Sequence, residues 1–338
     1  MTDDQGPQRA GPRMRALVQH SDRGPSDLIL HEDQQRPRPG PDDYLVRVEA
    51  AGVNFADTMQ TRGSYGGGPR PPYPAGFEAV GEIVAVGSRV AGPLPTGTRI
   101  VGTGPGAFAQ FLAMPAAGVL PIPDNWTSAA ALGMVLNWGT ALAALRPMGM
   151  ITPGDTVLIH AAAGGVGQPA VRLARHFGAR VIATASVSKH PAVRAAGADD
   201  VLDRDHPDLA AEILRRTDGV DLVLDSVGRT SVPVSLGVAR PYTGRVIVFG
   251  TASGPAAVSM EKMIFEHPVQ LKGLHIGSLA TSAPALYRNV LAELTDLIRL
   301  GVYPPGRPEI HPLADGPRVL ADLEAGRTTG KQALDPWR

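Results

Sequence analysis

The chain has 338 residues, of which 43% are apolar, and its formal net charge is zero. This length favours two domains, and the balanced charge gives no electrostatic reason to expect nucleic acid or a membrane surface as a partner. Cysteine is absent and the nine histidines are scattered along the chain. Disulfides and thiolate zinc sites are therefore excluded, and we predict no bound metal.

The first 13 residues are polar and rich in proline, and we expect them to form a flexible tail without the apolar core of a signal peptide. The most apolar stretch, residues 129–145, is interrupted by Asn137, Trp138 and Thr140. It is too short and too broken to span a bilayer, so we expect a cytoplasmic protein with no membrane partner.

Short alternating strands separated by glycine and proline turns fill residues 14–123. Examples are residues 44–50 (YLVRVEA) and 81–86 (GEIVAV), and the pattern predicts a compact β domain. The sequence pattern then changes. Residues 128–145 are rich in alanine, which indicates a helix.

A strand, a small-residue turn and a helix follow one another between Thr156 and Gly178 (TVLIHAAAGGVGQPAVRLARHFG). This order is typical of a dinucleotide-binding unit, because small residues let the backbone approach a pyrophosphate whose charge the helix N-terminus favours. The G-x-G-x-x-G pattern is incomplete, since Ala162 replaces its first glycine. The expected cofactor contacts in this turn are Ala163, Gly164, Gly165 and Val166.

Strands and helices alternate from this point onward. The strand candidates are residues 156–160, 180–184, 200–203, 221–225, 245–250 and 270–276. This alternation predicts a Rossmann domain, a doubly wound parallel sheet of six strands. The later segments are too short to fold alone, so we expect them to pack on the β domain. The predicted domains are a tail over 1–13, a β domain formed by 14–137 and 277–338, and a dinucleotide-binding domain over 138–276.

The choice of cofactor depends on the residues after the second strand of this sheet. NAD binders usually place an acidic residue there, whereas this chain has Ser186 and Lys189, with no Asp or Glu in residues 181–198. A carboxylate would repel a 2′-phosphate, while a hydroxyl and an ammonium bind it. Arg204, just past the third strand, adds a planar cation against the adenine or the phosphate, with a solvated surface residue as the alternative. We therefore predict NADPH.

From about Met14 onward the chain resembles the medium-chain dehydrogenase/reductase superfamily, and within it the zinc-free quinone oxidoreductases and enoyl reductases. The matching stretches are AAGVNFADTMQTRGSY (50–65), PAGFEAVGEIVAVGSRV (74–90), AAAGGVGQPAVRLARHFGARVIATAS (161–186) and GRTTGK (326–331). The resemblance implies an α/β protein with a GroES-like β domain, a Rossmann domain and a cleft between them for the nicotinamide. It also implies a homodimer that pairs the edge of the sixth strand, since an uncovered edge is an aggregation risk.

The departures from the zinc-dependent relatives indicate the chemistry. Those enzymes carry a ligating Cys where this chain has Asn54, and a His-Glu pair where it has Phe77 and Glu78. Without a Lewis acid, alcohol dehydrogenation is disfavoured. The resemblance to the zinc-free branch then implies hydride delivery to the β-carbon of an α,β-unsaturated carbonyl, or to a quinone.

The same resemblance assigns roles to single residues. Tyr65 is the candidate proton donor, with packing at the lip of the cleft as the alternative. Asn54 would position the nicotinamide or the substrate, or serve only in a local turn. Asp57 is expected to brace the loop, and Thr140 to reach the cofactor near its reactive end.

The remaining cofactor contacts are expected at the carboxyl ends of the last two strands, where ligands lie in open α/β sheets. They are Phe249, Gly250, Thr251 and Ile276, together with Lys331 of the closing Gly-Lys pair, which can also be a surface residue. The leading hypothesis is an NADPH-dependent reductase of an enone or an enoyl thioester. A quinone reductase and a non-catalytic NADPH-binding protein are the alternatives.

Overall fold

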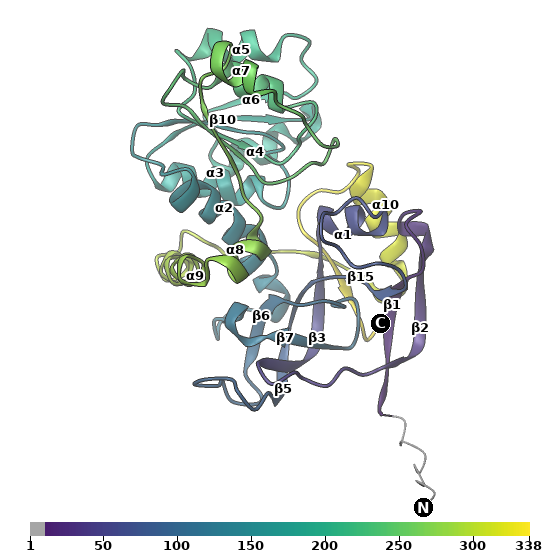
Figure 1. Cartoon of the computed structure of the whole chain (residues 1–338). Helices are drawn as coiled ribbons and strands as arrows, with labels where there is room; N and C mark the ends of the chain where they lie inside the picture. The colour runs from purple at the N-terminus through teal and green to yellow at the C-terminus, as the bar shows by residue number, and fades with distance from the viewer. Residues whose placement is uncertain (1–10) are drawn as a thin grey trace, which may run out of the picture. The chain divides into compact units, whose positions relative to one another are not determined.

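The structure is a computed structural model that describes residues 11–338. The chain folds into two compact units: residues up to Leu132 join Gly306–Arg338 in the first unit, and Gly133–Pro305 form the second (Figure 1). The tail predicted over residues 1–13 lies outside the described residues, apart from its last three positions, where the first strand begins at Arg13.

These limits differ from the domains predicted from the sequence, which placed residues 133–137 and 277–305 with the β domain. In the structure both segments belong to the second unit, including helix α9 (Pro284–Arg299). Tyr303 stacks on Trp138 there, with ring centroids 3.9 Å apart. The amphipathic pattern of α9 shows that one face must be buried, but it does not show against which unit.

The first unit contains two sheets, in which every strand pair except β15–β16 is antiparallel. The smaller sheet has the order β2-β1-β4 and the larger β15-β16-β3-β5-β6-β8, with β7 also paired with β3. The strands are β1 (Arg13–Gln19), β2 (Leu28–Gln35), β3 (Asp43–Val53), β4 (Tyr73–Pro74), β5 (Glu78–Val86), β6 (Arg99–Thr103), β7 (Phe111–Pro115), β8 (Leu120–Pro121), β15 (Glu309–Pro312) and β16 (Gln332–Asp335). Two helices, α1 (Phe55–Thr61) and α10 (Gly316–Glu324), accompany them.

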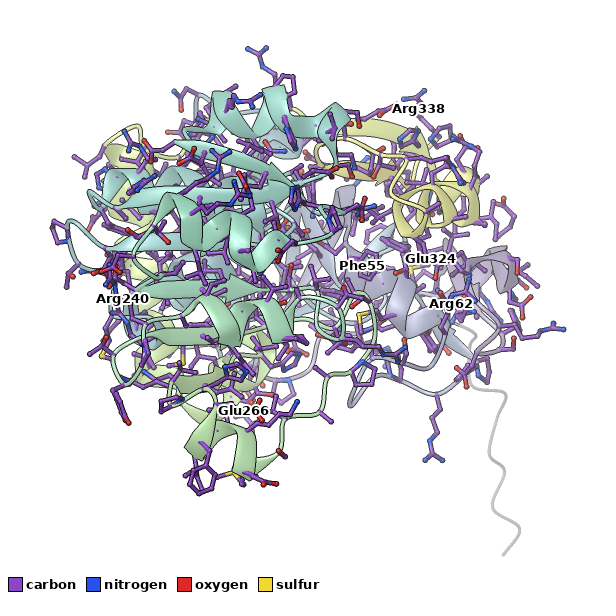
Figure 2. The ribbon with its side chains drawn as sticks, turned by 90° about the horizontal axis from the view of Figure 1, so that it is seen from above. Phe55, Arg62, Arg240, Glu266, Glu324 and Arg338 are labelled. Atoms are coloured by element: carbon purple, nitrogen blue, oxygen red, sulfur yellow. The ribbon has the colours of Figure 1, made fainter. Side chains whose placement is uncertain are left out.

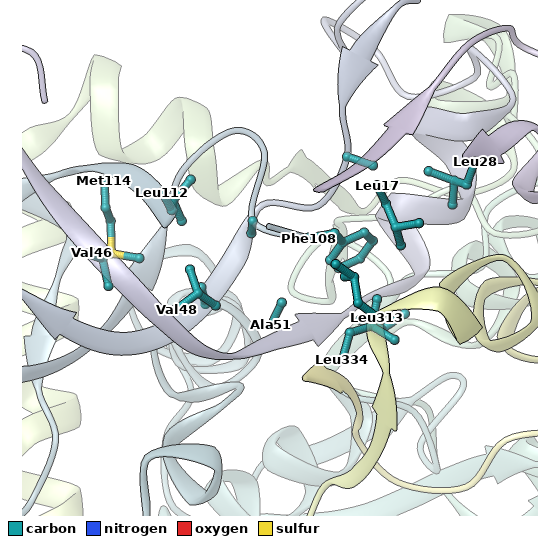
Figure 3. Packing of buried hydrophobic residues seen from close by; sticks show 14 of the residues in the cluster. Leu17, Leu28, Val46, Val48, Ala51, Phe108, Leu112, Met114, Leu313 and Leu334 are labelled. Atoms are coloured by element: carbon teal, nitrogen blue, oxygen red, sulfur yellow. The ribbon is translucent and has the colours of Figure 1, made fainter. Parts of the chain in front are cut away.

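The core of the first unit is built by the alternation that the sequence shows. Val46 and Val48 of β3 are fully buried, while Arg47 between them is partly exposed. They belong to a cluster that also includes Phe108 and Leu334, from segments far apart in the chain (Figure 3). A side chain at Gly76 would strike the Phe108 ring, so glycine is required there. The final strand is thus part of the same core as the first half of the chain.

The second unit is the predicted Rossmann domain. Its six parallel strands have the order β11-β10-β9-β12-β13-β14, which is the 3-2-1-4-5-6 arrangement of doubly wound nucleotide-binding folds. The strands are β9 (Thr156–Ile159), β10 (Arg180–Ala185), β11 (Asp200–Asp203), β12 (Leu222–Asp225), β13 (Arg245–Val248) and β14 (Gln270–Gly273). The prediction of a six-stranded parallel sheet is confirmed.

Five helices connect these strands (Figure 1): α3 (Gly167–His176), α4 (His190–Ala196), α5 (Leu209–Arg216), α6 (Val232–Val238) and α7 (Met260–Phe265). Helix α2 (Gly139–Ala143) precedes β9, and α8 (Ile276–Ser282) and α9 follow β14. Within residues 11–338, one helical run, Ser128–Met148, is long and apolar enough to cross a membrane by length and composition. Since 89% of its apolar window is buried inside the protein, it has the surroundings of a core helix.

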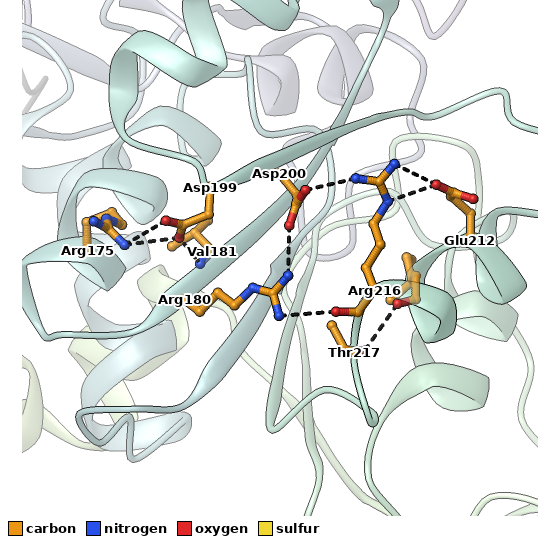
Figure 4. A network of polar contacts seen from close by, with 9 residues as sticks. Arg175, Arg180, Val181, Asp199, Asp200, Glu212, Arg216 and Thr217 are labelled. Atoms are coloured by element: carbon orange, nitrogen blue, oxygen red, sulfur yellow. Dashed lines mark hydrogen bonds and ion pairs between the residues drawn. The ribbon is translucent and has the colours of Figure 1, made fainter.

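Ion pairs at one end of this sheet join β10, β11 and α5. Asp200 accepts from Arg180 at 2.9 Å and from Arg216 at 2.8 Å, and Arg216 also bonds Glu212 one turn earlier in α5 (Figure 4). Arg175 of α3 bonds Asp199 in the same region. Exposed ion pairs contribute little to stability individually, so buried apolar side chains are the main source of the stability of this unit.

Candidate functional site

The turn between β9 and α3 has the geometry needed to hold a pyrophosphate. Ala161 adopts a positive φ of 50°, and a Cβ at Gly167 would lie 2.4 Å from the Ala161 carbonyl oxygen. Gly164 and Gly165 are exposed. Within the described part of the chain, the backbone N–H groups of Gly165 and Val166 have no hydrogen-bond acceptor. A phosphate at the N-terminus of α3 would accept from these groups, so this segment fits a dinucleotide.

The residues predicted to read the 2′-phosphate come together at the carboxyl edge of the sheet. Ser186 directly follows β10, which lies beside β9, and Lys189 follows within one turn. Arg204 directly follows β11, and its N–H donates to the Ala185 carbonyl at 3.0 Å. These hydroxyl and cationic side chains therefore lie on the strands next to the glycine turn, as NADPH binding requires.

The residues predicted beside the nicotinamide lie on the other half of the same edge. Phe249, Gly250 and Thr251 directly follow β13, and a Cβ at Gly250 would lie 2.6 Å from the Ser226 carbonyl oxygen. Ile276 does not end a strand as expected. The strand β14 stops at Gly273, and Ile276 is the first residue of α8, because the side chain of His275 caps that helix by accepting from the Ser278 N–H at 3.1 Å.

Thr140 is buried in α2, in the second unit. Its hydroxyl donates to the Leu136 carbonyl at 2.6 Å, so its proton is already used within the helical run. Asn137 lies against the glycine turn instead: a Cβ at Gly165 would stand 3.2 Å from the Asn137 amide nitrogen. The Asn137 side chain therefore lies close to Gly165 of the glycine turn.

The first unit contains a buried cluster of an amide, a carboxylate and an ammonium. Lys331 Nζ donates to Glu78 Oε2 at 2.5 Å and to Asn54 Oδ1 at 2.7 Å, and Asn54 Nδ2 donates to Glu78 Oε2 at 2.9 Å. Glu78 is fully buried, and the Lys331 side chain is 14% exposed. A Cβ at Gly52 would lie 2.4 Å from Glu78 Oε2, so only glycine leaves space for the cluster.

This cluster brings together two predicted site residues, Asn54 and Lys331, and a third that sequence reasoning did not assign to the site. Glu78 occupies the position of the glutamate in the His-Glu pair of zinc-dependent relatives. Its carboxylate now pairs with an ammonium, and within residues 11–338 no group of three or more His, Asp or Glu side chains is arranged to hold a metal. Both polar atoms of the Asn54 amide are engaged with protein groups, which fixes its orientation.

Asp57 is buried next to this cluster. Its Oδ2 accepts from the Asn54 backbone N–H at 2.8 Å, whereas its Oδ1 is buried without a hydrogen-bond partner. Burial raises the pKa of the Asp57 carboxyl to about 8, against the opposing effects of the Asn54 N–H and of Lys331. Asp57 is thus protonated over much of the neutral range, and it accepts the backbone N–H at the start of α1.

Tyr65 lies four residues beyond the end of α1, and its ring stacks on Phe77 with centroids 6.4 Å apart. The phenol is half-buried and lines a surface hollow of about 770 Å³. Burial, and secondarily the nearby Asp57, raises the pKa of Tyr65, so the phenol keeps its proton at neutral pH. The C-terminal end of helix α1 is bound to α10, because Arg62 Nη2 donates to Glu324 Oε2 of α10 at 2.8 Å (Figure 2).

Comparison with known protein families gives two matches, one in each part of the chain. Residues 40–124 match the family model described as the alcohol dehydrogenase GroES-like domain. Residues 165–296 match the model described as zinc-binding dehydrogenase. The two matched segments lie in the first and the second unit, respectively.

Two curated relatives and two solved structures extend these matches. The chain is 33% identical over 334 residues to a quinone oxidoreductase of Pseudomonas aeruginosa, covering 96% of this chain and 100% of that protein. It is also 33% identical over 335 residues to a phenolphthiocerol/phthiocerol polyketide synthase component of Mycobacterium tuberculosis, covering 97% of this chain but only 15% of that much longer protein. A mycobacterial protein solved with NADPH superimposes with a TM-score of 0.89 at 34% identity, covering 96% of this chain and 100% of that one. The CurK enoyl reductase superimposes with a TM-score of 0.84 at 27% identity, covering 95% and 99%.

The chain therefore belongs to the medium-chain dehydrogenase/reductase superfamily. Within that superfamily it falls in the branch of quinone oxidoreductases and enoyl reductases. The predicted fold class, a GroES-like β domain with a Rossmann domain, is confirmed by these matches and by the parallel sheet of the second unit.

Proposed function

We propose that this protein is an NADPH-dependent, metal-free reductase of an activated C=C bond, in an enone or an enoyl thioester. The observation that carries the proposal is the place of Tyr65, a half-buried phenol in the wall of a surface hollow, where its O–H can face a ligand. A quinone reductase needs no proton delivered to carbon. Quinone reduction is the second candidate function, because a relative that covers nearly the whole chain is named a quinone oxidoreductase.

The residues of the second unit support binding of NADPH. The N–H groups of Gly165 and Val166 would donate to the pyrophosphate, and Ser186, Lys189 and Arg204, which follow β10 and β11, would bind the 2′-phosphate. The solved relative that contains NADPH supports the same choice. When bound, NADPH supplies the hydride that adds to the β-carbon of the substrate.

The residues of the first unit would complete the reaction. As hydride adds to the β-carbon, negative charge develops on the α-carbon and the carbonyl oxygen, and Tyr65 would deliver its proton to the α-carbon. Asn54, Glu78 and Lys331 would act as positioning residues. Their mutual hydrogen bonds hold the start of α1, and with it the loop that carries Tyr65.

The experiment that tests this function is the Tyr65→Phe variant assayed with an enone and with a quinone. We expect kcat for the enone to fall about 100-fold, in the range typical of losing a general acid, while quinone reduction changes little. Tyr242→Phe is the matched control, because Tyr242 is 78% exposed and lies in the second unit. Unchanged enone turnover in Tyr65→Phe would eliminate the proton-donor role. If no electrophile oxidises NADPH, the protein is a non-catalytic NADPH-binding protein.

The assembly that we propose is a cytoplasmic homodimer joined at the β14 edge of the parallel sheet. Among the strands of residues 11–338, only β13 pairs with β14, and Leu271 on β14 is 38% exposed. Next to it in the chain, α7 exposes Met260, Ile264 and Phe265, at 72%, 59% and 80%. An open edge with exposed apolar side chains favours pairing with a second copy, which would bury both.

A further inference from the structure

Asp225, the last residue of β12, is a fully buried acid in the second unit. Its Oδ1 accepts from the Val227 N–H at 2.9 Å, the Gly228 N–H at 3.0 Å and the Ser231 hydroxyl at 2.6 Å. Its Oδ2 accepts from the Ser235 hydroxyl at 2.7 Å. Four donors directed at two oxygens suit an ionised carboxylate, which only accepts hydrogen bonds. A negative charge is therefore held inside this unit.

The groups that hold this charge are all neutral. Within residues 11–338, no Lys or Arg forms an ion pair with Asp225. His160, which directly follows β9, is the titratable side chain that its charge affects. Burial lowers the pKa of His160, and the opposing effect of Asp225 is smaller, so the imidazole stays neutral at neutral pH. The negative charge of Asp225 is thus not cancelled by a nearby cation.

Asp225 lies directly beside residues 249–251, which are predicted to contact the nicotinamide. Its carbonyl oxygen accepts from the Phe249 N–H at 2.9 Å. The loop that its carboxylate holds also packs on the loop after β13, because the Ser253 N–H donates to the Val227 carbonyl at 2.7 Å. Both loops follow the carboxyl ends of parallel strands, where ligands bind in open α/β sheets. The buried charge therefore lies at the half of this edge where we expect the nicotinamide.

The two redox forms of the cofactor differ in charge at that ring. Loss of a hydride, which takes two electrons with it, turns the neutral dihydronicotinamide into a cationic ring. A buried charge acts on such a ring without touching it, because the effective dielectric inside a protein is far below that of water. We propose that the Asp225 carboxylate stabilises the cationic nicotinamide and so raises the affinity of this unit for NADP+ relative to NADPH. The inference rests on the proposed function and adds a residue that tunes its cofactor.

The test is to titrate NADPH and NADP+ separately into wild type and Asp225→Asn. Asparagine has nearly the same shape without the charge, and the Ser235 hydroxyl can turn to accept from its amide N–H. We expect Kd for NADP+ to rise about tenfold, the scale of one buried charge, and Kd for NADPH to change less than about twofold. Asp218→Asn is the control, because it removes one negative charge from a fully exposed side chain of the same unit and should leave both values unchanged.

Ser235→Ala is a second variant, which keeps the charge and carries the test if Asp225→Asn does not fold. It removes the hydroxyl that donates to Asp225 Oδ2, so the charge is less compensated. The ratio of Kd for NADP+ to Kd for NADPH should then fall, by about twofold, in the direction opposite to that expected for Asp225→Asn.

The ratio of the two Kd values separates a charge effect from a structural one. Equal changes for both nucleotides in Asp225→Asn would overturn the inference, because a distorted loop weakens both alike. A ratio that rises or stays constant in Ser235→Ala would overturn it as well. If wild type binds neither nucleotide, the proposed function itself fails.

Discussion

Replacing Asp57 by Asn should make the protein more stable, and increasingly so as the pH rises. The Asp57 carboxyl is buried with one oxygen unpartnered, and its pKa rises from 3.8 to about 8 on folding. Below pH 3.8 the Asp57 carboxyl is protonated in both the folded and the unfolded chain. Between the two values the unfolded chain releases the proton and the folded chain retains it, so stability is lost as the pH rises toward 8.

The free-energy cost of burying Asp57 follows from the pH range between its two pKa values. From 3.8 to 7 is about three pH units, and each unit corresponds to about 1.4 kcal/mol, so burial of Asp57 costs on the order of 4 kcal/mol at pH 7. Asparagine has nearly the same shape, does not ionise, and can still accept the hydrogen bond from the Asn54 N–H. The variant should therefore recover much of this free energy without a cavity.

The assay is thermal unfolding of wild type and Asp57→Asn between pH 5 and pH 8. We expect the difference in Tm to widen with pH and to reach roughly 8 °C at about pH 7, at about 2 °C per kcal/mol for a unit of this size. Asp33→Asn is the control, because the Asp33 side chain is exposed on β2. A Tm difference that is constant across this range would show that Asp57 ionises at an ordinary pH and would refute the reasoning.

Three further variants test other parts of the structure. Lys331→Met should destabilise the first unit by about 3 kcal/mol in denaturant unfolding, because it removes the ammonium partner of buried Glu78. Adding Glu78→Gln should restore part of the lost stability. Equal stability of the single and the double variant would contradict this expectation. Lys189→Ala should raise the Kd for NADPH about tenfold in binding titrations and leave NADH nearly unchanged, so equal shifts would exclude the 2′-phosphate contact. Phe265→Asp should convert a dimer into a monomer in sedimentation, and no change in mass would remove α7 from the interface.

The dinucleotide-binding unit was predictable because its signals are local. A β-branched strand, a turn of small residues and an amphipathic helix follow one another between Thr156 and Gly178, and the structure confirms that order as β9 and α3. Right-handed crossover connections, which are nearly universal in parallel sheets, fix the face of the sheet on which each connecting helix lies, but they do not fix the strand order. The start of α8 at Ile276 was harder to predict from the sequence, because it depends on one side-chain cap from His275.

The buried cluster was not predictable from the sequence for a physical reason. Lys331 and Asn54 are 277 positions apart, and no periodic pattern connects them. Glu78 reads as one polar position at the start of a strand, and nothing local shows that its carboxylate is fully buried. Gly52 was the available signal, since a glycine inside a long strand often marks close approach by another group. The same limit applies to α9, whose amphipathic pattern does not name the unit on which it packs.

The most direct test of the central claim is isotope labelling of the product of enone or enoyl thioester reduction. NADPH with deuterium at the transferable position of the nicotinamide ring should place deuterium on the β-carbon, and a reaction in D₂O should place deuterium on the α-carbon. Tyr65→Phe should slow turnover without moving either label. Turnover of quinones alone, with no label entering carbon from either source, would contradict the account.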